Sequence, residues 1–266
     1  MNRFPTEWLR LREPFDHAAR STALIETLLD ILPASRPLRI LELAAGLGSG
    51  MRFLAPLLPT PQHWTMIDHD PALLASIGQP PTNKITLETL EFDLRKLDKL
   101  NFSTDLVSTQ ALLDLVSNDW LESLVNRLAD QSIPILAALT VDGRVRWSPE
   151  DPKDAEIQQA FRAHQTSDRG FGPSVGTQAT LELERLLSAR NYTIIRKQAD
   201  WSIAPAFARI LKELVDGTAE AAMEACSNIT TTKTVTDWHR RRRAAIASGD
   251  LSLQVGHLDL LALPSN

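Results

Sequence analysis

The stretch Leu38-Arg-Ile-Leu-Glu42-Leu-Ala44-Ala-Gly46-Leu-Gly48-Ser-Gly50 decides how the rest of the chain is interpreted. Residues 38–44 form a nearly continuous apolar run, which is typical of a strand covered on both faces. The glycines that follow allow the backbone to approach a ligand closely, and the helix behind them offers unpaired N–H groups. The stretch therefore predicts a strand, a ligand-binding turn and a helix.

Strand and helix patterns alternate from this stretch in both directions, which predicts a doubly wound α/β fold. We expect a single domain over residues 1–266, with helices on both faces of a mainly parallel, seven-stranded sheet. The other expected strands are 64–68, 85–92, 106–109, 133–141, 193–196 and 252–263.

Three segments lie outside this alternation. Residues 1–37 are expected to be a helical segment, with one helix over 16–32. Residues 142–176 are polar and rich in proline and glycine, which predicts a lid-like loop carrying one helix. Residues 205–249 are predicted to form a helical cap inserted before the last strand.

The composition excludes several classes of protein. The 266 residues carry 28 Lys+Arg against 33 Asp+Glu, and this acidic balance argues against a dedicated nucleic-acid binder. The single cysteine, Cys226, excludes a disulfide framework, and the histidines lack metal-ligand spacing, so no metal is expected. The basic run 239–243 is interpreted as a solvated helix face. Without a signal peptide or a long apolar run, we expect a cytoplasmic protein with no membrane partner and leave its oligomeric state open.

Two carboxylates narrow the choice of ligand. Asp68 ends the strand after the glycine loop, where a carboxylate can accept the hydroxyls of a ribose. Gly46, Gly48 and Gly50 depart from the G-x-G-x-x-G spacing of nicotinamide enzymes. Glu42 precedes the loop, and its negative charge suits a cationic aminoacyl group better than a pyrophosphate.

The run ILELAAGLGSG, followed by WTMIDHDPALL, resembles the first two motifs of class I S-adenosylmethionine-dependent methyltransferases. The resemblance covers roughly residues 38–139 and implies their Rossmann-like sheet, closed by an antiparallel pair of strands, here 193–196 with 252–263. Glu42 takes the place of the motif's acid, Gly46 and Gly48 match its second and third glycines, and Ala44 replaces the first.

The same resemblance implies further cofactor contacts. Asp68 would bind the ribose and His69 would lie beside the adenine. Asp93 and Leu94 match the segment whose acid binds the adenine amino group. Gln110 belongs to the stretch 105–114, which resembles the fourth-strand motif that closes the pocket under the sulfonium.

The acceptor site is read from the loops that follow the fourth and fifth strands. Asp114 and His164 are candidate catalytic residues, since an acid or a histidine can take a proton from the acceptor. Asp168, Arg169 and Trp201 are candidate substrate contacts.

Each assignment has a structural alternative. Glu42 could be a surface charge, Asp68 and Asp93 could be helix caps, and Asp114 could be a solvated acid at a helix start. The 164–176 stretch could be a plain connection, and Trp201 could anchor the core.

The sequence thus favours a methyltransferase that uses S-adenosylmethionine, releases S-adenosylhomocysteine and acts on an unidentified small molecule. The chain has no N-P-P-[YF] signature for amino-group methylation of bases or glutamine. The alternatives are an oxidoreductase with an NAD(P)-type cofactor and a methyltransferase-like scaffold that binds without catalysis.

Overall fold

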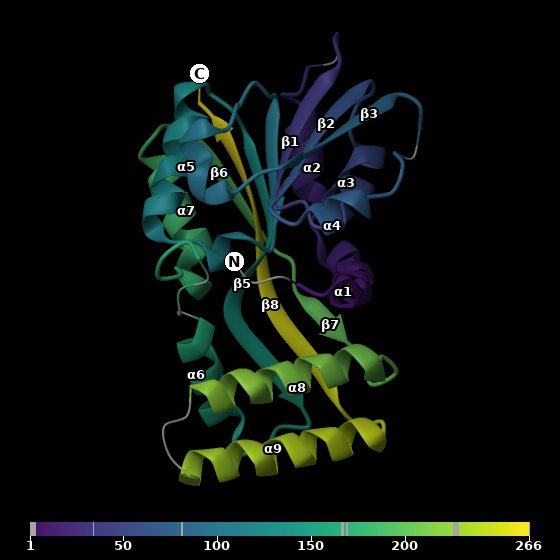
Figure 1. Ribbon diagram of the computed structural model, residues 1–266, viewed down its shortest axis with the longest axis vertical. Coiled ribbons are helices and arrows are strands. Elements are labelled where there is room, and N and C mark those ends of the chain that lie inside the picture. The colour runs from purple at the N-terminus through teal and green to yellow at the C-terminus, as the bar shows by residue number, and fades with distance from the viewer. Residues whose placement is uncertain are drawn as a thin grey trace.

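The computed structural model describes residues 4–33, 35–80, 82–165, 168, 170–225 and 229–265. A central sheet with the strand order β3-β2-β1-β4-β5-β8-β6 organises this part of the chain, and the short β7 pairs with β8 (Figure 1). Strands β1 to β5 run parallel, whereas β8 is antiparallel to β5, β6 and β7. The strands are β1 (Leu38–Leu43), β2 (Gln62–Asp68), β3 (Ile85–Glu91), β4 (Leu106–Gln110), β5 (Ile135–Ser148), β6 (Tyr192–Gln198), β7 (Trp201–Ile203) and β8 (Ser252–Pro264). The predicted mainly parallel α/β fold is confirmed, and β7 adds one strand to the seven expected.

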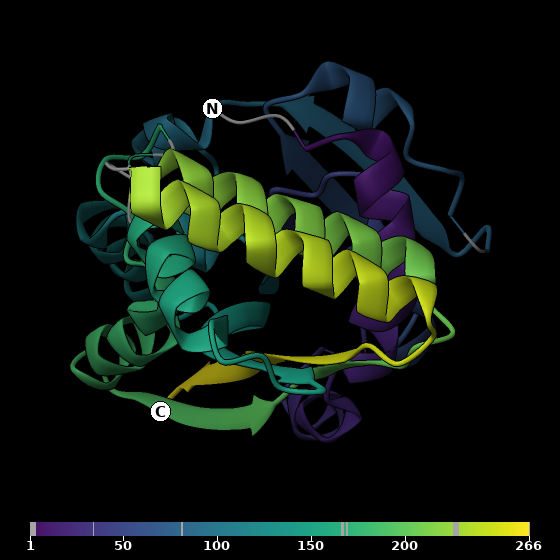
Figure 2. The same cartoon turned by 90° about the horizontal axis from the view of Figure 1, so that it is seen from below.

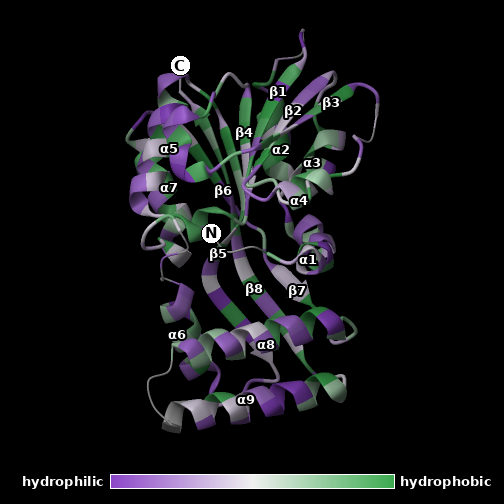
Figure 3. Ribbon diagram, viewed as in Figure 1, coloured by the Kyte–Doolittle hydropathy of each residue, from purple (hydrophilic) through white to green (hydrophobic). Residues whose placement is uncertain are grey.

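Helices cover both faces of the sheet because successive side chains of a strand point to opposite sides. Leu38 and Ile40 of β1 pack in a core with α2 (Thr22–Leu29) and α3 (Ser49–Leu54). Leu41 and Leu43 pack in the opposite core with α5 (Asn118–Asp130) and α7 (Ala179–Ser188). The green strand interiors in Figure 3 mark this apolar sandwich.

The single helix expected over 16–32 is wrong. Two helices, α1 (Thr6–Ala19) and α2, are separated at Arg20, whose backbone is extended. At this break the Ser21 N–H donates to the buried Asp259 carboxylate of β8, with 3.0 Å between the two atoms. A continuous helix would hold that N–H within its own backbone, so the contact with β8 favours the break.

The loop expected over 142–176 is wrong in its first part, because residues 142–148 continue β5. Val145 pairs with Val255 and Trp147 with Leu253, so β5 and β8 extend together beyond the rest of the sheet. The helix expected within this segment is present as α6 (Asp154–Gln165).

The extended ends of β5 and β8 carry a third apolar core with the helices of the 205–249 segment. These helices are α8 (Ala208–Glu224) and α9 (Ile229–Ala247), and they lie side by side in both views (Figures 1 and 2). The remaining short helices are α4 (Pro71–Ala75), η1 (Ala55–Leu57), η2 (Leu94–Lys99), η3 (Leu113–Leu115) and η4 (Gly176–Gln178). The described residues include no helix that could span a membrane.

The basic run on α9 is held by acids of the same extension. Arg241 and Arg242 pair with Asp151 and Asp154, and Arg243 pairs with Asp216 of α8. Arg242 is only 2% exposed, so the solvated face expected for this run is wrong at that position.

Candidate functional site

The loop between β1 and α3 turns through left-handed backbone conformations. Ala44, Gly46 and Gly48 have φ values of 54°, 53° and 77°. Glycine adopts such angles without steric cost, whereas alanine pays roughly 1–2 kcal/mol. Ala44, which stands in the place of the motif's first glycine, therefore holds the conformation that a glycine usually supplies.

Glu42 lies entirely inside the protein at the end of β1. Its carboxylate rests against Gly50, because a Cβ added to that glycine would lie 1.9 Å from Oε1. Neither carboxylate oxygen meets the geometry of a hydrogen bond with a described residue. Burial raises the pKa of the group, and the nearby Ser108 hydroxyl and the charge of Arg20 oppose that shift. The surface-charge alternative for Glu42 is wrong. A glycine stands at position 50 because this carboxylate takes the room that a side chain there would need.

A buried arginine stands near Glu42. Arg20, at the break between α1 and α2, has no hydrogen-bond partner for Nε or Nη1 among the residues described. Burial lowers the pKa of its guanidinium, and the charges of Asp259, Glu42 and Asp16 oppose that shift. Glu42 and Arg20 thus place two charged groups behind the glycine loop, and each has polar atoms without a hydrogen-bond partner among the described residues. Burying such groups costs folding free energy unless further partners are bound.

Asp68 ties the end of β2 to the glycine loop. Its Oδ2 accepts from the Gly46 N–H at 2.8 Å, and its Oδ1 accepts from the Asp70 N–H at 3.0 Å. His69 Nδ1 lies 3.1 Å from Oδ1. Asp70, rather than Asp68, caps α4 by accepting from the Ala72 N–H, so the cap alternative for Asp68 is wrong.

Asp93 is engaged locally. It caps η2 by accepting from the Arg95 N–H, and its carboxylate pairs with the Arg95 guanidinium, 2.7 Å away. Hydrogen bonding from Arg95 lowers its pKa to about 2. The cap alternative therefore describes its present contacts, and the adenine contact stays a prediction. The neighbouring Leu94 is buried, and its carbonyl accepts from Trp120 Nε1.

Four side chains lie at or near the carboxyl ends of β1, β2 and β4, two of them fully buried and two partly buried. Each has a buried polar atom without a hydrogen-bond partner in the described part of the chain: Glu42, His69, Ser108 and Gln110. Strand order reverses between β1 and β4, and such switch points are where ligands of doubly wound sheets bind. Unpaired buried polar groups are rare in folded proteins, so this cluster fits a polar ligand.

Helix α1 packs against the same loop. The Leu9 side chain lies 3.6 Å from where a Cβ of Gly46 would be. Glu13 pairs with Arg52 of α3 at 2.6 Å, and His17 Nε2 lies 3.1 Å from Ser49 Oγ. The N-terminal helix thus forms one wall of the candidate site.

Asp114 of η3 follows the fourth strand and is partly buried. Burial raises its pKa to about 6, and the positive charge of Arg12 opposes the shift. Near neutral pH this carboxyl can both hold and release a proton, which is the behaviour expected of an acid–base group.

Arg12 belongs to a compact group at the α1 face of the extension. It pairs with Asp16 at 2.9 Å, and its guanidinium lies 5.0 Å from the centre of the Trp201 ring. His257 lies on Trp201, with 5.0 Å between ring centres. Burial and the charge of Arg12 lower the pKa of His257 to about 4, so its ring is neutral at neutral pH.

The tautomer of His257 follows from a hydrogen bond of its ring. Nδ1 lies 3.0 Å from the Val255 carbonyl oxygen, which can only accept, so Nδ1 carries the proton. Nε2 is then an acceptor, and it has no hydrogen-bond partner among the residues described. Arg12, Arg20 and His257 were not identified from the sequence, and the Arg12–Asp16 spacing of four residues on a helix was the one available signal.

The other sequence-predicted acceptor residues have contacts of their own. His164 pairs with Glu224 of α8 at 2.7 Å. Asp168 accepts from the N–H groups of Gly170 and Gly172, while Arg169 lies outside the described residues. Trp201 is 3% exposed within the third core, which matches its core-anchor alternative.

Several solved structures have a similar architecture. A cyclopropane-fatty-acyl-phospholipid synthase-like protein from Lactobacillus casei matches with TM-score 0.56 and 16% identity, over 97% of this chain and 94% of the other. The cyclopropane synthase MmaA2 from Mycobacterium tuberculosis matches with TM-score 0.52 and 13% identity, over the same shares. A protein from Bacillus halodurans, provisionally described as a methyltransferase, matches with TM-score 0.51 and 10% identity, over 91% and 98%.

The chain has the class I methyltransferase fold. No protein-family model matches the sequence, and no curated protein does either. Within the methyltransferase fold, the buried polar cluster lies at the carboxyl edge of the sheet, and the extension built from β5, β8, α8 and α9 lies beyond it (Figure 1).

Proposed function

We propose that this protein is an S-adenosylmethionine-dependent methyltransferase that acts on a small molecule. The observation that carries the proposal is the buried Glu42 carboxylate, which has no hydrogen-bond partner among the described residues and lies behind a glycine loop. A buried carboxylate is stabilised by a cation, and the methionine end of the cofactor carries positive charge.

The residues that would hold the cofactor share the carboxyl edge of the sheet. Asp68 keeps lone pairs for ribose hydroxyls beyond the two backbone N–H groups that it already accepts. Besides Glu42 and Asp68, the proposed contacts are Ala44, Gly46, Gly48, His69, Asp93, Leu94 and Gln110.

When bound, the cofactor supplies a methyl group activated by its sulfonium, so the protein's own task is mainly positioning. In the proposed mechanism Asp114, with its pKa of about 6, takes the proton that a hydroxyl or amine acceptor loses. The unprotonated Nε2 of His257 accepts a hydrogen bond from a polar group of the acceptor, and Arg12 holds Trp201 and Asp16 in place.

Glu42 also weighs against a nicotinamide cofactor, because its negative charge behind the glycine loop would repel a pyrophosphate. The ion pairs that occupy the α9 arginines support a small acceptor over a nucleic acid. A methyl-transfer assay distinguishes an enzyme from a scaffold that binds the cofactor without catalysis.

The assay supplies labelled S-adenosylmethionine with a panel of small hydroxylated, carboxylated and amine metabolites. With the acceptor found, Asp114→Asn should lower turnover by ~10²–10⁴ while S-adenosylhomocysteine affinity stays close to wild type. His164→Ala is the comparison variant, since His164 pairs with Glu224 on α8. Full turnover of the Asp114→Asn variant would show that Asp114 does not take the proton of the acceptor. Cofactor binding without methyl transfer to any acceptor would favour the non-catalytic scaffold.

A further inference from the structure

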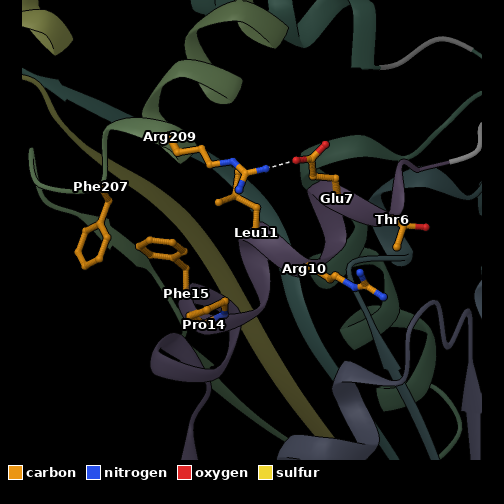
Figure 4. Close-up of a pocket in the computed structure, with 8 residues that line it drawn as sticks. All are labelled: Thr6, Glu7, Arg10, Leu11, Pro14, Phe15, Phe207 and Arg209. Atoms are coloured by element: carbon orange, nitrogen blue, oxygen red, sulfur yellow. Dashed lines mark hydrogen bonds and ion pairs between the residues drawn. The ribbon is translucent and has the colours of Figure 1, made fainter. Parts of the chain in front are cut away.

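A cavity lies outside the polar cluster at the sheet edge. It occupies about 720 Å³ between α1 and the start of α8 and is lined by Thr6, Glu7, Arg10, Leu11, Pro14, Phe15, Phe207 and Arg209 (Figure 4). This volume lies within the range of small-molecule sites, ~300–1,000 Å³. None of the proposed cofactor contacts lines it, so it is a separate place on the molecule.

The apolar end of this cavity is aromatic. Phe15 and Phe207 meet edge to face, with ring centres 5.1 Å apart and an angle of 87° between the rings. Phe207 is 51% exposed. Phe15 is held from behind by a contact with the buried Trp201. An exposed aromatic ring held against a second ring offers a flat ligand a surface to stack on.

The opposite end of the cavity is polar and cationic. Figure 4 shows the two phenylalanines at one end and Arg10 with Thr6 at the other. Glu7 and Arg209 form an ion pair between these ends. Arg10 makes no ion pair with any residue that the structure describes, so one positive charge of the cavity is left without an anion.

We propose that this cavity, which we call the α1–α8 groove, binds a small anion with an aromatic body. The aromatic body would stack on Phe15 and Phe207, and the anionic group would meet Arg10. A guanidinium is suited to carboxylates and sulfonates because it presents several N–H donors in one plane. The proposal does not depend on methyl transfer, since it concerns a different set of residues.

The test compares two fluorescent probes that share one aromatic body. Anilinonaphthalene sulfonate carries the anion, and N-phenylnaphthylamine lacks it; each is titrated into the full chain without cofactor. Phe207→Ala should weaken both probes, on the order of fivefold or more. Arg10→Gln should weaken the sulfonate by roughly tenfold and leave the neutral probe unchanged. Glu7→Gln should tighten the sulfonate, because it removes a negative charge from the groove.

Leu57→Ala is the matched control, since Leu57 is 41% exposed on η1 and does not line the groove. The proposal is overturned if Phe207→Ala binds both probes like Leu57→Ala, or if Arg10→Gln affects both probes alike. It is also overturned if Phe207→Ala changes the sedimentation behaviour of the chain instead of probe binding, because the groove would then be an interface between copies.

Discussion

At the scale of single residues, Glu42 and Gly50 form one unit. The carboxylate occupies the space that a side chain at position 50 would need. The sequence alone indicated an acid and three glycines, but it could not show that one of those glycines exists to make room for the acid. That relation depends on how the loop folds back over the end of β1.

Gly50→Ala is therefore expected to destabilise the protein. The new Cβ would lie 1.9 Å from Oε1 of Glu42, so the carboxylate or the helix must shift. Overpacking of this kind costs about 1–3 kcal/mol. The measurement is urea unfolding, with Gly217→Ala in α8 as control. Gly217 has open space around it, so alanine there should add about 0.5–1 kcal/mol of stability. An unfolding midpoint of Gly50→Ala equal to wild type would contradict the placement of Glu42.

Asp114 should show itself in the pH dependence of stability. Its pKa of about 6 in the folded protein lies above the unfolded value, ~3.9, so ionisation costs stability as pH rises through that range. Asp114→Asn, which carries no charge, should match wild type near pH 4 and exceed it above pH 6. The gain is at most about 3 kcal/mol.

Unfolding of wild type and Asp114→Asn at several pH values checks this directly. The other buried carboxyls are common to both proteins and cancel in the difference. A constant stability difference across the pH range would mean that Asp114 has an ordinary pKa.

At the scale of elements, local patterns predicted the parallel strands, most clearly β1 and β5, because residues 38–44 and 133–141 are nearly continuous apolar runs. They failed at residues 142–148, where Asp142-Gly143 is typical of a turn. In the structure Gly143 has a φ of 84°, beside a register shift, and the strand resumes with Val145 and Trp147 facing β8. They also missed the extent of α1, which continues through Pro14.

The contacts that complete the candidate site could not be predicted from the sequence, because they join residues that are far apart in the chain. Ser21 binds Asp259, which lies 238 positions away. His257 joins Trp201 and Arg12 only after β7, β8 and α1 have packed together. No local spacing encodes such groupings.

The extension depends on the Arg242–Asp154 pair, which joins α9 to α6. Arg242 also donates to the Pro149 carbonyl at 2.6 Å, and its guanidinium lies 5.5 Å from the Trp147 ring centre. Arg242→Ala would leave Asp154 without this partner in a partly buried position. We expect a loss of about 3–5 kcal/mol in thermal or urea unfolding.

Arg240→Ala is the matched control for that variant. Arg240 lies on the same helix and pairs with Asp237, but its side chain is 77% exposed, so its loss should change stability little. Equal effects of the two substitutions would show that burial of the Arg242 pair does not stabilise the extension.

At the scale of the whole molecule, the sheet brings the ends of β1, β2 and β4 together and α1 packs against their glycine loop. The extension carries α8 alongside, so that the α1–α8 groove and the buried polar cluster share α1 as a wall. The class I methyltransferase fold and the buried Glu42 carboxylate, which has no hydrogen-bond partner in the described part of the chain, together support one central claim. This claim is that the glycine loop binds S-adenosylmethionine.

Calorimetric titration of the full chain with S-adenosylhomocysteine, with NAD run in parallel, tests that claim most directly. The account predicts saturable binding of S-adenosylhomocysteine at one site and no binding of NAD. Asp68→Ala should weaken the former roughly ten- to a hundredfold, because hydrogen bonds to a charged acceptor are lost. Binding of NAD in place of S-adenosylhomocysteine, or an Asp68→Ala variant that binds S-adenosylhomocysteine as well as wild type, would contradict it.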